Sequence, residues 1–285
     1  MRVACIGSVT VDTIVGQGNQ AVSAGGTSFF AALALASMGD SVTVFTSYPQ
    51  DWRPYVEVLN SLGIDVVKVG DEIAQFRIVY RDGSRKLYLT SKPFRLKLTM
   101  SELHGFDSIL FGPVAGEVEA HLVTEAASLN RRVGVGLQGF VRDFGPDGRV
   151  FNRKTDLNFL KGTFLISGSS REFSAALGGL KDVWGLPSLY KVVTSGKRGA
   201  AILWENQRAA GRADPKVKSK DPTGAGDVLL ASVLHYLSSG FPPERAIALA
   251  TRVASAATLE VGAKKFEAIR RSLSDLSVSP RYRHR

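Results

Sequence analysis

The sequence Asp221-Pro222-Thr223-Gly224-Ala225-Gly226-Asp227 runs directly into the apolar segment 228–237. Small residues followed by good helix formers predict a tight loop that becomes a helix. The first amide N–H groups of a helix have no partner within it, and the helix dipole adds partial positive charge there. Gly224 and Gly226 let an anion approach these amides. Asp227 adds a carboxylate beside the predicted anion site, where a general base for phosphoryl transfer to a hydroxyl would stand.

The composition is that of a globular protein with a large core. Of its 285 residues, 44% are hydrophobic and 22% charged. No segment reaches the roughly 18 apolar residues of a membrane span, and the first residues predict a strand rather than a signal peptide. The single cysteine, Cys5, excludes an intramolecular disulfide and a CxxC metal site. We therefore expect a cytoplasmic protein that does not bind membranes.

The chain is basic, with 36 Lys and Arg against 26 Asp and Glu and a net charge of +10. A positive surface suits nucleic acids, but it also suits small anionic substrates such as nucleotides. Part of the excess lies in the terminal residues 281–285, and the remaining charges follow no nucleic-acid-binding motif. The expected partners are therefore small molecules and not nucleic acid, which remains the weaker alternative.

The N-terminal region predicts a buried strand followed by an acidic residue. Residues 3–9 are apolar and β-branched, which is typical of a strand covered on both faces. Asp12 follows where this strand is expected to end, at the edge of an open parallel sheet where ligands bind. A turn aspartate that caps local amides is the alternative.

A pair of glycines, Gly25-Gly26, precedes the next predicted helix. Residues 29–38 are small or apolar and are followed by Gly39, a residue that commonly ends helices. Thr27 or Ser28 is expected to cap the start of this helix. The glycines would bring the backbone close to a ligand at that point.

Strands and helices alternate along most of the chain. Further strands are expected at 42–46, 108–111, 132–137, 164–166, 190–194 and 200–204, and helices at 52–62, 117–130, 171–177, 226–238 and 243–260. Residues 75–80 and 86–90 alternate in polarity around Asp82-Gly83, which is typical of a β-hairpin. The order predicts one α/β domain over residues 1–285, with a mostly parallel sheet covered by helices on both faces. The hairpin would form a small lid inserted at about residues 66–98, which residues 10–24 can join.

Several sequence motifs resemble those of the ribokinase-like, or PfkB, family of carbohydrate and nucleoside kinases. Residues 221–227 resemble its D-[T/P]-x-G-A-G-D signature, and residues 194–200 (TSGKRGA) resemble its T-x-G-x-x-G nucleotide loop. Gly25-Gly26 before a small-residue helix resembles its substrate signature, and Asp12 and the hairpin fall where the family has a substrate aspartate and a lid. The resemblance spans residues 1 to about 265, and it is specific because the parts come in the family's order. It implies a ribokinase-like fold.

The resemblance implies a catalytic role for the opening stretch. Asp227 would take the proton from the acceptor hydroxyl as this hydroxyl attacks the γ-phosphate of ATP. The amides of Gly224, Ala225, Gly226 and Asp227 would form an anion hole that counters charge on the transferring group. A first-turn carboxylate placed by the helix dipole is the structural alternative for Asp227.

Further positions of the family imply the ATP site. Thr194, Gly196 and Gly199 would hold phosphates of ATP, although such a strand–turn–strand segment is often structural. Where the family has N-x-x-E, this chain has Ser169 and Glu172. Ser169 would contact ATP through a hydroxyl in place of an amide, and Glu172 would hold Mg²⁺ through water.

Acceptor contacts are implied at Asp12, Gly25, Gly26 and two further segments. Phe30, next to Phe29, stands where the family has an asparagine, and it would either stack on a substrate or pack in the core. Residues 138–142 (QGFVR) resemble a phrase of shorter archaeal and plant members, including myo-inositol kinases. Gln138 would contact the substrate and Arg142 a phosphate, with a surface arginine as the alternative.

The sequence thus predicts a kinase that depends on ATP and Mg²⁺ and phosphorylates an alcohol. The aromatic pair Phe29 and Phe30 slightly favours a nucleoside, including a pyrimidine nucleoside, or a sugar as acceptor. myo-Inositol and a sugar phosphate such as fructose 6-phosphate are the alternatives. A ligand-binding regulatory protein on the same fold is the non-enzymatic alternative. The chain is expected to be a monomer or a homodimer.

Overall fold

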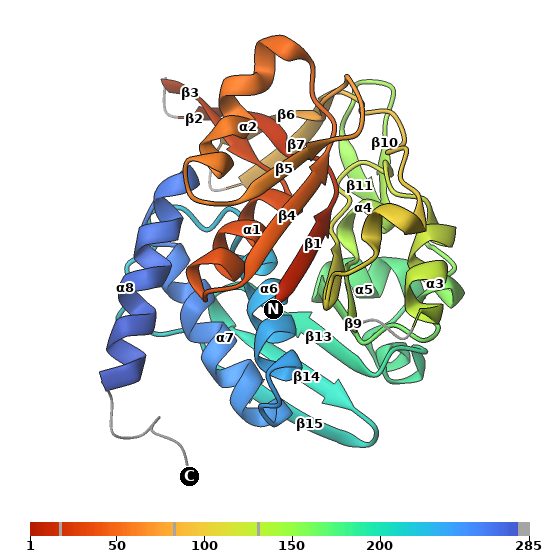
Figure 1. Ribbon diagram of the computed structural model, residues 1–285, viewed down its shortest axis with the longest axis vertical. Coiled ribbons are helices and arrows are strands. Elements are labelled where there is room, and N and C mark those ends of the chain that lie inside the picture. Colours follow the sequence, from red (N-terminus) through yellow and green to blue (C-terminus); the bar gives the residue numbers. More distant parts are fainter. Residues whose placement is uncertain (17–18, 82–83, 130–131, 279–285) are drawn as a thin grey trace.

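The main sheet is mostly parallel. The computed structural model describes residues 1–285 except 17–18, 82–83, 130–131 and 279–285 (Figure 1). Within these residues the main sheet has nine strands in the order β15-β14-β13-β12-β9-β8-β1-β4-β5. They are β1 (Arg2–Ile6), β4 (Ser41–Thr46), β5 (Asp65–Lys68), β8 (Ser108–Phe111), β9 (Arg132–Gly136), β12 (Leu165–Ser169), β13 (Tyr190–Thr194), β14 (Ala200–Trp204) and β15 (Gln207–Gly211). Neighbouring strands from β13 to β5 run parallel, and β14 and β15 add an antiparallel edge.

Helices cover both faces of this sheet. They are α1 (Thr27–Ser37), α2 (Arg53–Asn60), α3 (Ala120–Ser128), α4 (Gln138–Val141), α5 (Ser170–Leu177), α6 (Ala225–Ser238), α7 (Pro243–Ala257) and α8 (Lys265–Val278). Figure 1 shows α7 and α8 on the opposite side of the molecule from α3. The alternation of side chains in β1 separates the two cores: Val3 and Cys5 lie in the cluster of α1, α6 and α7, and Ala4 and Ile6 in that of α3 and α5. This arrangement confirms the predicted fold class.

A second sheet lies at one end of the molecule and has the order β3-β2-β6-β7. Its strands are β2 (Thr10–Gly16), β3 (Asn19–Gly25), β6 (Gln75–Arg81) and β7 (Ser84–Ser91), and a short pair, β10 (Arg142–Phe144) and β11 (Val150–Asn152), forms a separate ribbon. β6 pairs antiparallel with β7 and parallel with β2. The segments predicted as hairpin strands therefore share a sheet with residues 10–16 and 19–25. The predicted turn at Asp82-Gly83 lies outside the described residues.

The structure corrects the predicted end of the first strand. β1 ends at Ile6, because Gly7 has φ +150° and a Cβ at this position would lie 2.3 Å from the carbonyl oxygen of Gly112. Asp12 is therefore an inner residue of β2 in the second sheet, and not the residue at the end of β1. The alternative reading, a turn aspartate that caps local amides, does not apply either, because Asp12 lies inside a strand.

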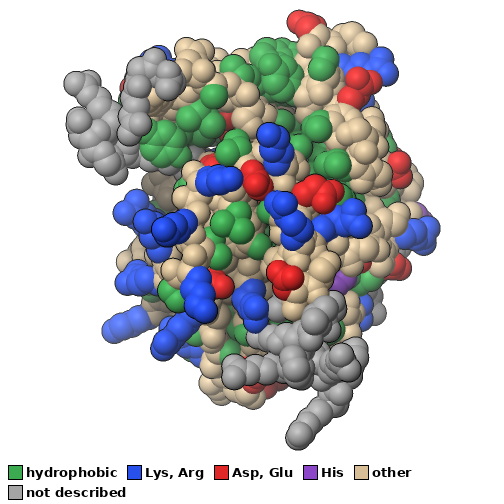
Figure 2. Space-filling model, turned by 90° about the vertical axis from the view of Figure 1, so that its left-hand side faces the viewer, with side chains coloured by type: hydrophobic (Ala, Val, Ile, Leu, Met, Phe, Trp, Pro, Cys, Tyr) green, Lys and Arg blue, Asp and Glu red, His purple; other side chains and the backbone are tan. Residues whose placement is uncertain are grey.

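Other differences lie in the C-terminal half. The sequence interpretation ended the fold with two helices, but α8 follows them and packs Phe266 and Ile269 into the core. β15 was not predicted because its residues are small or polar and mostly exposed, so they show no apolar pattern. The basic residues 281–285 lie outside the described residues. Figure 2 shows Lys and Arg side chains spread over one face with Asp and Glu among them.

In the described part of the chain, no helix combines the length and the apolar character that crossing a membrane requires.

Candidate active site

A cavity of about 430 Å³ opens between the carboxyl ends of the main-sheet strands and the second sheet. Gln138 lies just after β9, Ser169 ends β12 and Thr194 ends β13, while Asp12 and Tyr80 come from the second sheet. Open α/β sheets bind ligands at this edge, and small-molecule sites have volumes of about 300–1,000 Å³. The cavity is therefore the candidate active site.

The cavity gathers most of the site residues that the sequence predicted. Those that line it are Asp12, Gly26, Phe30, Gln138, Arg142, Ser169, Glu172, Thr194, Gly224, Gly226 and Asp227. Within the described residues, the predicted residues that do not line it are Gly25, Ala225, Gly196 and Gly199.

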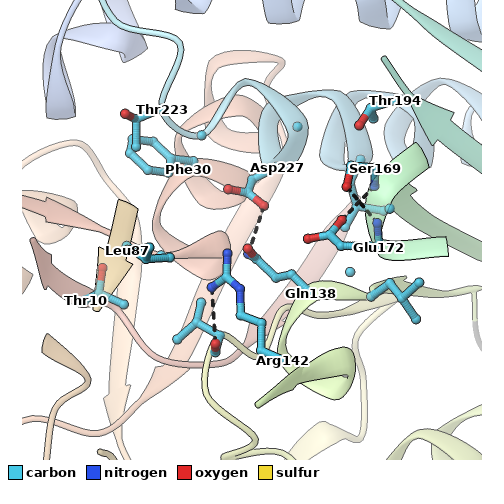
Figure 3. Close-up of a pocket in the computed structure, with 18 of the residues that line it drawn as sticks. Thr10, Phe30, Leu87, Gln138, Arg142, Ser169, Glu172, Thr194, Thr223 and Asp227 are labelled. Atoms are coloured by element: carbon cyan, nitrogen blue, oxygen red, sulfur yellow. Dashed lines mark hydrogen bonds between the residues drawn. The ribbon is translucent and has the colours of Figure 1, made fainter. Parts of the chain in front are cut away.

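The side chains are arranged around a central carboxylate. Figure 3 shows Asp227 in the middle, Thr10 and Leu87 on one side, and Glu172 and Thr194 on the other. A group at the centre can contact ligands on both sides.

The loop before α6 forms a tight turn around Gly224. Gly224 is the N-cap of α6, with φ 76°. The N–H of Ala225 donates to Pro222 O (3.2 Å), and that of Asp227 donates to Gly224 O (3.0 Å). The predicted anion hole therefore loses these two amides, because the turn itself uses them. In the described part of the chain, the N–H groups of Gly224 and Gly226 donate no hydrogen bond, which leaves them available to an anion.

The carboxylate of Asp227 is held from two distant parts of the sequence. Thr27 Oγ1 donates to Asp227 Oδ1 (2.9 Å), and Gln138 Nε2 donates to the same oxygen (3.4 Å) and to Thr27 Oγ1. The helix cap predicted at Thr27 or Ser28 is wrong, since Gly26 occupies the N-cap position with φ 93°. The hydroxyl of Thr27, the first residue of α1, orients Asp227 instead.

Thr27→Val is expected to lower kcat by roughly 10- to 150-fold, the scale of one hydrogen bond to a charged group. Valine keeps the shape of this fully buried side chain but cannot donate to Asp227, so the carboxylate loses one of its orienting partners. Steady-state kinetics of the variant check this result. Thr27→Ser retains the hydroxyl and should keep most of the activity; equal losses in both variants would contradict the role of the hydroxyl.

Asp12 is fixed inside β2 by its neighbours. Thr10 Oγ1 donates to Asp12 Oδ1 (2.8 Å). A Cβ at Gly25 would lie 2.5 Å from Asp12 Oδ2, so the glycine leaves room for this carboxylate, and Gly25 itself does not line the cavity. A buried carboxylate at the cavity wall suits an acceptor with several hydroxyl groups.

Arg142 supplies a positive charge to the same end of the cavity. Its Nη1 donates to Val114 O (3.2 Å), and its guanidinium lies 5.8 Å from the ring centre of Phe76. Arg142 begins β10, and it lines the cavity rather than lying in a surface loop. Its planar guanidinium is suited to bind a phosphate or hydroxyl oxygen.

The aromatic pair belongs largely to the core. Phe29 has no exposed surface and Phe30 is 3% exposed. The ring of Phe30 lies directly against Gly224, where a Cβ would approach its atoms to 2.3 Å. Phe30 therefore lines the cavity and packs against the loop of residues 221–227, here called the anion loop. It offers little ring surface for stacking.

The other end of the cavity contains the residues predicted to bind ATP and Mg²⁺. Ser169 is the N-cap of α5, and its N–H donates to Glu172 Oε2 (2.7 Å) while its Oγ accepts from the Glu172 N–H (3.2 Å). This capping box explains why both residues stand at this helix start. No group of three or more His, Cys, Asp or Glu with metal-binding geometry occurs among the described residues. Mg²⁺ needs only one or two carboxylates when phosphates and waters supply its other ligands, so Glu172 fits this ion.

The glycines of the predicted nucleotide loop are explained by the turn itself. Gly196 has φ 57° and Gly199 has φ 94°, and a Cβ on Gly199 would lie 2.1 Å from Gly211 O. The close approach of β14 to β15 therefore requires a glycine here. Only Thr194 of this loop reaches the cavity in the described structure.

Some lining residues were not singled out from the sequence. Thr10, Ile78 and Leu87 come from the second sheet, and Thr223 lies in the anion loop. The position of Thr27 directly after Gly25-Gly26 was the available signal for its role, but the helix-cap interpretation competed with it.

The sequence matches the profile of the pfkB family of carbohydrate kinases over residues 2–269. The chain therefore belongs to this family. A search of curated proteins finds no match.

Solved structures share the fold at low identity. A pyrophosphate-dependent kinase of the ribokinase family is 20% identical with a TM-score of 0.80, covering 93% of this chain and 99% of that chain. Ribokinase from Thermotoga maritima is 19% identical with a TM-score of 0.74, covering 95% and 99%. Ribokinase from Arabidopsis thaliana, solved with ribose and ATP, is 14% identical with a TM-score of 0.75, covering 95% and 98%.

Proposed function

We propose that this protein transfers the γ-phosphoryl group of ATP to a hydroxyl of a small polyol. The observation that carries the proposal is the position of Asp227, whose Oδ1 is held by Thr27 beside the uncommitted N–H groups of Gly224 and Gly226. Attack of an alcohol on a phosphoryl group needs a base and an anion site close together, and this position offers both.

In the proposed reaction, Asp227 receives the proton of the acceptor hydroxyl as its oxygen bonds to the γ-phosphorus. The bond to the bridging oxygen breaks, and ADP leaves with the electron pair. The amides of Gly224 and Gly226, at the positive end of α6, counter the charge on the transferring group. Mg²⁺, when bound through Glu172 and waters, would neutralise phosphate charge.

A sugar or a cyclitol is the acceptor class that the cavity supports best. Asp12, Gln138 and Arg142 offer acceptors and donors for several hydroxyl groups. The reason for favouring a nucleoside was ring stacking by Phe30, and Phe30 is only 3% exposed. A nucleoside is the second candidate, because Tyr80 and Leu87 provide an apolar wall on which a base could lie.

ATP is the proposed donor, with Thr194 and Ser169 near its phosphates. Pyrophosphate is the second candidate, because Gly196 and Gly199 lie outside the cavity and the polar residues Ser169, Glu172 and Thr194 line this end of it. Three structures of similar fold are described as pyrophosphate-dependent kinases, two of them with myo-inositol as ligand or substrate. Pyrophosphate and myo-inositol therefore belong in the substrate test.

We further propose that residues 1–285 form one domain whose second sheet serves as a lid. Tyr80 and Leu87 of this sheet line the cavity opposite the main-sheet residues. Movement of such an element over bound ligands would exclude water during transfer.

The function is tested by a screen of donor and acceptor pairs with Mg²⁺. ATP and pyrophosphate would be combined with sugars, cyclitols, sugar phosphates and nucleosides, and the phosphorylated product would be measured directly. We expect transfer from ATP to a sugar or cyclitol. Transfer only to nucleosides, or only from pyrophosphate, would favour the second candidates. Ligand binding without transfer in any pair would contradict the proposal and favour a binding protein on the same fold.

A further inference from the structure

Lys265, the first residue of α8, has a side chain without any exposed surface. Its Nζ donates to the main-chain oxygens of Glu260 (2.7 Å), Asp221 (2.9 Å) and Ala257 (3.1 Å), and it lies 3.2 Å from Asp221 Oδ2. The ammonium group has three donors, and all three reach a carbonyl oxygen. Charged side chains are almost never fully buried unless they are paired in this way.

The oxygens around Lys265 form a cage suited to a monovalent cation. Ala257 ends α7, and the negative end of the helix dipole favours positive charge there. Mg²⁺ and Ca²⁺ take oxygens at about 2.0–2.1 and 2.3–2.6 Å, so the observed distances of 2.7–3.2 Å suit a larger ion such as ammonium. Burial lowers the pKa of Lys265, while Asp221 and Glu260 act in the opposite direction and favour the charged form.

The cage is joined directly to the anion loop. Asp221, whose carbonyl and carboxylate both contact Lys265, also accepts a hydrogen bond from the Thr223 N–H through Oδ1 (2.9 Å). Thr223 is followed by Gly224, the N-cap of α6. The Lys265 ammonium also lies 5.9 Å from the ring centre of Phe30, the ring that packs against Gly224. Lys265 thus contacts the anion loop at Asp221, and the ring of Phe30 lies between its ammonium and the turn at Gly224.

We propose that Lys265 is a positioning residue whose tethered ammonium fixes the anion loop for phosphoryl transfer. Its removal by truncation creates a site for a small monovalent cation bound by the same oxygens. The proposal rests on the proposed function for its effect on turnover. Lys265 does not line the cavity, so its effect comes through Asp221 and Thr223 and not through contact with a substrate.

The test compares Lys265→Ala, which empties the cage, with Lys265→Met, which fills it with an apolar chain of similar length. Lys264→Ala, at an exposed neighbouring position, is the control. Rates are measured with the donor and acceptor that the wild type uses, at constant ionic strength, with tetramethylammonium chloride replaced stepwise by ammonium chloride.

In tetramethylammonium chloride, Lys265→Ala and Lys265→Met are expected to lose at least about tenfold in kcat, the scale of one charge-assisted hydrogen bond. The KM for the acceptor should change little. Ammonium should restore most of the activity of Lys265→Ala, because it can occupy the emptied cage, and it should not restore Lys265→Met. Wild-type turnover of Lys265→Ala without ammonium, or equal rescue of both variants, would overturn the proposal.

Thermal melting in the same buffers gives a readout that needs no turnover. Ammonium should raise the melting temperature of Lys265→Ala and leave that of Lys265→Met and of Lys264→Ala unchanged. Equal shifts in all variants would overturn the cation cage. Absence of turnover in the wild type with every donor and acceptor would count against the proposed function instead. The melting data would still show whether the oxygens around Lys265 bind a monovalent cation.

Discussion

Asp227→Asn is expected to lower kcat by about 10²–10⁴-fold, the range that a positioned general base contributes. The amide has the same shape as the carboxylate, and its oxygen can still accept the hydrogen bond from Thr27 Oγ1. It cannot accept the proton of an attacking hydroxyl at neutral pH. The loss should therefore appear in kcat, whereas binding of ATP, measured by calorimetry, should remain close to that of the wild type.

A matched substitution separates the chemistry from the loss of a negative charge. Asp65→Asn removes one carboxylate at an exposed position of β5 and should leave both kcat and ATP binding unchanged. Melting temperatures show whether each variant is folded. If Asp227→Asn turned over within a few-fold of the wild type, Asp227 would be only a first-turn carboxylate favoured by the helix dipole.

The anion loop and the start of α6 could be predicted from sequence, because both depend on residues that are neighbours in the chain. Small residues before a helix former determine where α6 begins, and the predicted start at residue 226 differs by one from the observed Ala225. The use of individual amides could not be predicted. Whether the N–H of Ala225 faces an anion or bonds to Pro222 O depends on the tightness of the turn, which the residue types do not fix.

The partners of Asp227 were beyond local reasoning. Thr27 is 200 residues away in the sequence, and only the packing of α1 beside α6 brings the two side chains together. The sequence showed a hydroxyl residue at a helix start, for which a cap is the usual role. Since Gly26 takes the cap position with φ 93°, the hydroxyl is left to bind elsewhere.

Phe30 shows why a substrate contact is hard to assign from one residue. Its position after the glycine pair predicted either stacking or core packing, and both readings agree with its chemistry. The space above Gly224 decides between them, because this glycine has no side chain and the ring fills the gap. The two residues are far apart in sequence, so the pairing becomes visible only in the folded chain.

This pairing leads to the second large effect, since Gly224→Ala is expected to disrupt both folding and catalysis. At φ 76° an added Cβ costs about 1–2 kcal/mol in backbone strain. The same Cβ would lie 2.3 Å from the ring of Phe30, and overpacking of this kind costs typically about 1–3 kcal/mol. The loop would have to shift, and a displacement of about 1 Å can reduce activity roughly 10²-fold. Thermal melting and kcat/KM check the two parts.

Gly226→Ala is the matched control, because it adds the same methyl group two residues away. Its Cβ meets no described atom within 4 Å, and its backbone has no positive φ, so the melting temperature should not fall. The methyl group would enter the cavity beside the anion site, and the KM for the donor should rise. Gly224→Ala is thus expected to change the conformation of the loop through its overlap with Phe30. Gly226→Ala is expected to leave that conformation intact and to hinder binding of the donor.

A double-mutant cycle identifies the ring as the cause of the overlap at Gly224. In a Phe30→Ala background the added methyl group meets no ring, so Gly224→Ala should cost only its backbone strain of about 1–2 kcal/mol. The cost in the wild-type background should be larger by the overpacking contribution. Equal costs in both backgrounds would show that Phe30 does not confine the turn. The anion loop would then be fixed from the Asp221 end alone, through the cage of Lys265.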